Sequence, residues 1–120
     1  MGSSGPGPPR PLPRAPVIRR RPRFADVIDR QLALFVEEDG DLLDDVAAAL
    51  ERYDAADRDE AEELYGDYVL AADAAAERLG ELRDTYARTL AGRDADAYAD
   101  AFTKAAARRW PALEVALREA

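Results

Sequence analysis

The sequence predicts an all-α protein: an antiparallel up-down three-helix bundle built on a long helical hairpin, with a disordered basic arm before it. Apolar residues recur every three or four positions through residues 24–120, as they do on one face of a helix. Seven of the eight prolines instead fall between residues 1 and 23. We therefore divide the chain into a Pro/Arg-rich arm, residues 1–23, and a helical bundle domain, residues 24–120.

The charge of the chain divides at the same place. Six of the 17 basic residues and none of the 25 acidic ones lie within residues 1–25, so residues 26–120 carry 11 basic against 25 acidic residues, a formal charge of −14. A basic arm beside an acidic body is typical of proteins that bind other macromolecules. The densest cluster, which we take as a candidate interaction site, comprises Arg19, Arg20, Arg21 and Arg23. It could contact the acidic body of its own chain, a partner protein or, less favoured, nucleic acid.

The residue types exclude several classes of site. The chain contains no Cys and no His, which removes thiolate and imidazole chemistry together with the commonest metal ligands. We expect no cofactor. No apolar run approaches the roughly 18 residues of a membrane span. The expected location is therefore cytoplasmic.

Residues 23–56 are predicted to form one long helix. Apolar side chains keep the same phase on both sides of the polar segment 37–41, since Ile28, Phe35 and Leu42 lie seven residues apart as in a coiled coil. Gly40 lies inside that segment, where we expect a kink. The alternative is a loop there, followed by a separate helix with Asp41 as its N-cap.

A polar turn at residues 55–59 is predicted to join this helix to a second one. Either of two acidic pairs has the spacing of a capping box, Asp57 with Glu60 or Asp59 with Glu62. A short turn between two long helices favours an antiparallel hairpin.

Apolar residues then step by three and four from Leu64 to Leu90, and Gly92 is expected to end the second helix at its C′ position. Reflecting the sequence about the turn places Phe35 opposite Gly80. A large ring facing a glycine would allow the two helices to approach closely.

Asp94 is predicted to cap a third helix, which should kink or restart at Trp110–Pro111 because proline lacks the amide hydrogen that a helix interior needs. The last apolar turn then comprises Leu113, Ala116 and Leu117. Reflection of this helix about Arg93 places Trp110 near the alanines at 75 and 76. Trp110 is therefore expected to anchor the core, with an exposed binding hot spot as the alternative.

Carboxylates are the only catalytic groups that the sequence offers for a metal-dependent reaction. Glu37 and Glu38, together with Glu60 and Glu63, resemble the helix-borne acid pairs of all-α nucleotide pyrophosphohydrolases, and that resemblance implies a magnesium-dependent hydrolase. In the hairpin, however, the two pairs should lie about 30 Å apart along the bundle.

The sequence therefore favours a non-enzymatic helical bundle that works through protein–protein interaction, as an adaptor, a scaffold or a regulatory module. The basic arm would serve as a tether or an auxiliary contact. The magnesium-dependent hydrolase and a nucleic-acid-associated protein are the alternatives. A homo-oligomer is a possible form of the interaction, and the identity of a protein partner is not encoded in any motif.

Overall fold

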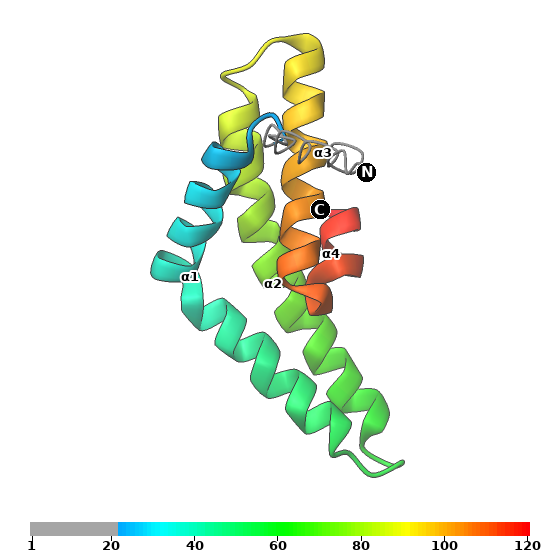
Figure 1. Ribbon diagram of the computed structural model, residues 1–120. Helices are drawn as coiled ribbons and strands as arrows, with labels where there is room; N and C mark the ends of the chain where they lie inside the picture. The colour runs from blue at the N-terminus through cyan, green and yellow to red at the C-terminus, as the bar shows by residue number, and fades with distance from the viewer. Residues whose placement is uncertain (1–21) are drawn as a thin grey trace, which may run out of the picture.

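The structure, a computed structural model, describes residues 22–120, and these are all-helical apart from short turns. Three long helices follow one another: α1 (Ala25–Asp54), α2 (Ala61–Ala87) and α3 (Gly92–Arg109). A short 3-10 turn, η1 (Pro111–Leu113), leads into α4 (Glu114–Glu119). Figure 1 shows α1 and α2 as a long hairpin, with α3 beside α2 and α4 folded back along α3. The predicted all-α class is confirmed, while nearly all of the predicted arm lies outside the described residues.

The helix α1 runs through the polar segment, as predicted, and bends there. Asp39 departs from helical geometry, with φ −123° and ψ 21°, one residue before Gly40. Arg78 of α2 donates a hydrogen bond to the Asp39 carboxylate, with 3.1 Å between Nε and Oδ2. This bond, and a second one to Glu81, raise the pKa of Arg78 above its usual value. The bend in Figure 1 is therefore held from α2. Two helical segments of α1 meet at the non-helical Asp39, so the expected kink is present and the second segment does not begin with Asp41 as its N-cap.

Backbone groups, and not side chains, start the second helix. The turn spans residues 55–60, where the amides of Glu60 and Ala61 both donate to the carbonyl of Asp57 at 3.0 Å. No side-chain cap hydrogen bond is made at the start of α2, so both predicted capping boxes are wrong. The turn closes with main-chain bonds, which leave the acidic side chains to the solvent.

Gly92 does not end α2 as predicted. That helix ends at Ala87, and Gly92 begins α3 with φ +47°, in the left-handed region that favours glycine. Asp94 does not cap α3 either, since Ala91 occupies the N-cap position. The Asp94 carboxylate instead pairs with Arg23 at 2.9 Å, which ties the start of α1 to the start of α3.

Gly80 is buried, but the prediction that it faces Phe35 is wrong. A Cβ atom on Gly80 would meet Nη2 of Arg83 at 3.5 Å and Cβ of Ala120 at 3.7 Å, so this glycine borders α4. Phe35 packs edge-on against Trp110, with ring centroids 5.4 Å apart. Reflection about the turn identified which helices pair but not which faces meet, because successive residues of a helix point about 100° apart.

The predicted break at Trp110–Pro111 is confirmed and reverses the chain. Helix α3 ends at Arg109, and Trp110 has φ −128° and ψ 79° before Pro111 opens η1. The predicted last apolar turn is also confirmed, since Leu113, Ala116 and Leu117 are buried. The hairpin is consequently longer than α3, and its outer half extends past the α3–η1 corner in Figure 1.

Tyr98 lies fully buried at the centre of the aromatic core. Its ring packs against Tyr86 and Phe24 at centroid distances of 4.6 and 5.5 Å, and its hydroxyl donates to the side-chain carbonyl of Gln31. Burial is the main cause that raises the pKa of Tyr98 to about 12. One side chain of α3 thereby links both arms of the hairpin.

We expect stability to fall between pH 10 and pH 12. Above pH 10 the unfolded chain releases the Tyr98 proton while the folded chain holds it to about pH 12, so the raised pKa stabilises the fold below pH 10 and that contribution is lost as pH rises. Urea unfolding followed by circular dichroism across this pH range measures the slope of the free energy of unfolding against pH. Tyr98→Phe should remove a large part of it, and an unchanged slope in that variant would contradict this assignment.

Two glycine substitutions should have opposite effects on stability. Gly40→Ala should stabilise by about 0.5–1 kcal/mol, because no atom lies within 4 Å of the added Cβ and alanine suits a helix better. Gly92→Ala should cost about 1–2 kcal/mol, because an alanine at φ +47° is strained although the space is equally open. The free energy of unfolding in urea measures both. Destabilisation by Gly40→Ala would disprove a helix running through residue 40.

Candidate functional site

A continuous groove runs between α2 and α4. It consists of two adjoining cavities, of about 280 and 420 Å³, that share Asp73, Ala116 and Glu119 in their walls. The smaller cavity lies toward the hairpin turn and the larger one toward the end of α2. We call the whole feature the α2–α4 groove.

The end of the groove near the hairpin turn is apolar. Tyr65 and Val69 of α2 face Val115 of α4 across it, and these side chains are 48%, 36% and 67% exposed. Beneath them the Tyr68 hydroxyl donates to the backbone carbonyl of Ala112. Burial, and then the neighbouring Tyr65, raise the pKa of Tyr68. The hydrogen bond holds η1 against α2 and so fixes the distance between the two walls.

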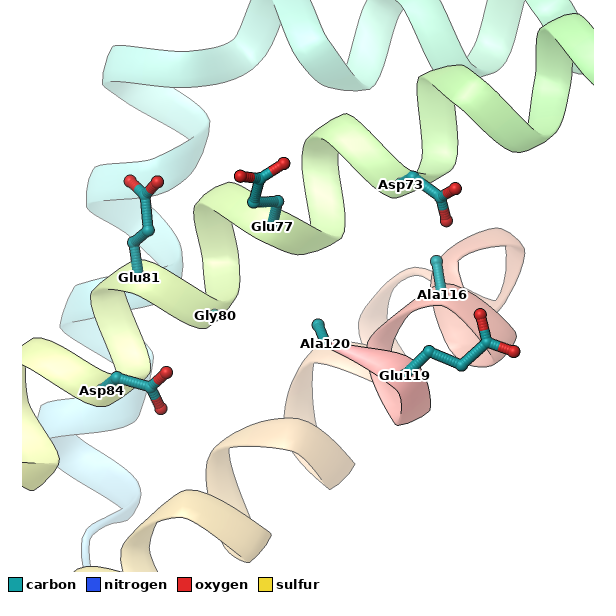
Figure 2. A pocket seen from close by; sticks show the side chains of 8 residues that line it. All are labelled: Asp73, Glu77, Gly80, Glu81, Asp84, Ala116, Glu119 and Ala120. Atoms are coloured by element: carbon teal, nitrogen blue, oxygen red, sulfur yellow. The ribbon is translucent and has the colours of Figure 1, made fainter.

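The other end of the groove is acidic. Its charged lining consists of Asp73, Glu77, Glu81, Asp84 and Glu119, and no Lys or Arg lines either cavity. Figure 2 shows that Asp73 points from α2 toward α4, which carries Glu119, while Glu77 and Glu81 stand on the edge of α2 farther from α4. The groove thus changes from apolar to negatively charged along its length.

Two of these carboxylates are neutralised by arginines and three are not. Glu81 pairs with Arg78 at 3.1 Å, and Asp84 pairs with Arg83 at 2.8 Å. Among residues 22–120, the remaining three form no ion pair: Asp73, Glu77 and Glu119. The unpaired negative charge therefore lies on Asp73 and Glu119, which line both cavities, and on Glu77 at the edge of the groove.

Arg83 lies beside the acidic end, outside the lining of the cavity. Besides Asp84, its guanidinium donates to Oγ1 of Thr103 at 3.2 Å and to the backbone carbonyl of Ala120 at 3.3 Å. Gly80 lies beside it and faces Ala120. These bonds connect α2, α3 and the end of α4, so the groove has fixed walls at both ends.

The sequence interpretation missed this groove. It followed the α2 stripe that begins at Leu64, whereas the groove uses a second face of the same helix. That face carries Tyr65 and Val69 and then Asp73, Glu77 and Glu81 at four-residue intervals. The signal for the α2 wall was a helical face on which apolar residues are followed by acids. The signal for the opposite wall was the apolar Val115 after Pro111.

Of the predicted interaction residues, the structure describes only Arg23 and Trp110, and these two lie apart. Arg19, Arg20 and Arg21 lie outside the described residues. Arg23 is exposed at the start of α1, where it pairs with Asp94 and lies 4.8 Å from the centroid of the Phe24 ring.

Trp110 lies at the opposite end of α3, half-buried against Phe35 and with the Arg109 guanidinium 5.0 Å from its ring centroid. It packs against the core cluster, in agreement with its predicted anchoring role. It also lines a separate cavity of about 420 Å³ beside Leu43 and Leu50 of α1. Its role as a binding residue stays a prediction.

The acid pairs of the hydrolase alternative occupy different parts of the hairpin. Glu37 and Glu38 precede the bend of α1, whereas Glu60 and Glu63 lie at the hairpin turn. Within residues 22–120, no group of three or more Asp or Glu side chains is arranged to hold a metal ion. In the same part of the chain, no helix combines the length and the apolar character needed to cross a membrane.

Comparison with known protein families, with curated proteins and with solved structures finds no match to this chain.

Proposed function

We propose that this protein is a non-enzymatic interaction module that binds a helical segment of a partner protein in the α2–α4 groove. One observation carries the proposal: Tyr65, Val69 and Val115 present apolar surface to the solvent across a single groove. Isolated exposed apolar residues are ordinary on protein surfaces, but apolar side chains gathered on two walls of a groove mark a binding site. An amphipathic helix is the ligand that fits between two helices.

Hydrogen bonds between the walls support the same proposal. The Tyr68–Ala112 hydrogen bond and the Arg83 bonds to Thr103 and Ala120 connect α2 to η1, α3 and Ala120 without a partner. A preformed groove loses little conformational entropy on binding, so more of the energy from apolar burial becomes affinity. As an adaptor or scaffold, the protein would present this groove on a stable hairpin.

The two alternatives have less in their favour. For a magnesium-dependent hydrolase, the acid pairs lie at separate places on the hairpin. For a nucleic-acid contact, Arg23 is the one described member of the arginine cluster, and it already pairs with Asp94. The arm is proposed as a tether or auxiliary contact to a protein partner.

A matched pair of substitutions tests the groove. The probe is a fluorescent, uncharged amphipathic peptide of about 19 residues, helical in an Ala/Gln background, with Leu at i, i+4 and i+7. Val115→Asp should weaken its binding at least tenfold, because the charge enters the apolar end of the groove. Leu70→Asp is the control: Leu70 is equally exposed, at 71% against 67%, and lines neither cavity of the groove. Fluorescence anisotropy gives both dissociation constants.

The comparison is decisive because both changes replace an exposed aliphatic residue with the same charge. Circular dichroism should show that the two variants unfold at similar temperatures. Equal losses of affinity in the two variants, or no binding of the probe to the unmodified protein, would contradict the proposed function.

A further inference from the structure

We infer that the segment bound in the α2–α4 groove is basic as well as amphipathic: its apolar residues lie against Tyr65, Val69 and Val115, and its Lys or Arg residues lie against Asp73, Glu77 and Glu119. This inference rests on the proposed function and specifies the partner's chemistry. It follows from the order of side chains along the groove.

Charge complementarity is the first argument. All five charged side chains that line the groove are carboxylates, and three of them, Asp73, Glu77 and Glu119, have no ion-pair partner among the described residues. Bringing an acidic segment there would place like charges together, whereas a basic one gains attraction and steering during encounter. An apolar segment without charge would leave the three carboxylates partly desolvated and unpaired.

The geometry of α2 sets the length and pattern of the ligand. From Tyr65 to Asp84 the α2 wall rises about 28 Å, the length of about 19 helical residues, whereas the opposite wall at residues 112–120 rises about 12 Å. A helical partner of up to about 19 residues would therefore contact both walls over about two turns. The apolar end occupies about the first two turns of this span, and the carboxylates follow at intervals of four residues. The partner should therefore carry large apolar residues over about two turns, followed by Lys or Arg spaced three or four residues apart.

Two other occupants fit less well. A second copy of the chain would bring its own carboxylates against Asp73 and Glu119 if it docked through the same face. The chain's own arm is basic, but Pro22 and Arg23, where the described residues begin, line a different cavity, between α1 and α3 with Ala101. We therefore favour a separate basic segment, and occupancy by the arm is an outcome that the experiment below distinguishes.

Binding of three matched peptides to the full chain tests the inference. All three share the Leu positions of the uncharged probe; the second carries four Arg in its last turns and the third carries four Glu there. At a salt concentration of about 0.01 M, the Arg peptide should bind at least tenfold more tightly than the uncharged one, and the Glu peptide more weakly. In about 1 M salt, where the screening length falls to about 3 Å, the three affinities should converge.

A triple substitution locates the charge effect. Asp73→Asn, Glu77→Gln and Glu119→Gln together should abolish the tenfold preference for the Arg peptide and leave the uncharged peptide's affinity unchanged. The control triple, Asp45→Asn, Glu51→Gln and Asp54→Asn on α1, changes the net charge equally and should keep most of the preference. Loss of the preference in both triples would overturn the inference, because the attraction would then belong to the whole acidic body.

The outcomes separate the inference from the function on which it rests. If the uncharged and Arg peptides bind equally and both are sensitive to Val115→Asp, the groove binds helices but the partner is not basic. If the full chain with Arg19, Arg20 and Arg21 all changed to Gln binds the Arg peptide at least tenfold more tightly, the arm occupies the groove and a separate partner is excluded. If sedimentation shows a dimer that the peptide dissociates, the occupant is a second copy.

Discussion

The break at Trp110–Pro111 determines the surface that this fold offers. Proline removes an amide hydrogen and clashes with the preceding turn, so α3 ends at Arg109 although α1 and α2 continue well beyond that level. The chain then reverses into η1 and α4, whose buried residues Leu113 and Leu117 pack into the core. Because α4 packs against α2 on a different side from α1, a groove forms between α2 and α4. A longer α3 without this reversal would have left no α4 to form the second wall.

The remaining long-range contacts hold this arrangement in place. Tyr98 joins α3 to α1 through Gln31, Arg78 joins the bend of α1 to α2, and Tyr68 joins α2 to η1. Each is a polar group that finds its partner on another helix, and each sits at a different level of the hairpin. Apolar contacts alone tolerate a shift of one helix along another, whereas directed hydrogen bonds between helices fix their register.

The helices were predictable because their signals are local. The apolar phase of Ile28, Phe35 and Leu42 persisted through the polar segment, and the structure has one bent helix there. Pro111 predicted the break for an equally local reason. The capping boxes at Asp57 and Asp59 were not formed, because the backbone of the turn satisfied the first amides of α2 by itself.

The groove was not predictable by the same means. Its walls come from residues about 45 positions apart, such as Tyr68 and Ala112, and no periodicity reports which face of α2 the returning α4 covers. Gly80 illustrates the difficulty: the sequence predicted a close approach to Phe35, but a Cβ atom there would make only ordinary contacts, with Arg83 and Ala120. Of the candidate residues chosen from sequence, the two that the structure describes, Arg23 and Trp110, lie elsewhere.

The most direct measurement is amide chemical-shift mapping by NMR while the Arg-bearing amphipathic peptide is titrated into the isotopically labelled full chain. A groove-bound basic helix should shift signals along residues 65–84 of α2 and 112–120, on the two walls that line the groove. The indole signal of Trp110 and the amides of residues 43–50 should stay unchanged, because they surround the separate α1–η1 cavity. Shifts confined to that cavity, or to residues 22–29 and 94–108 near Arg23, would contradict the account.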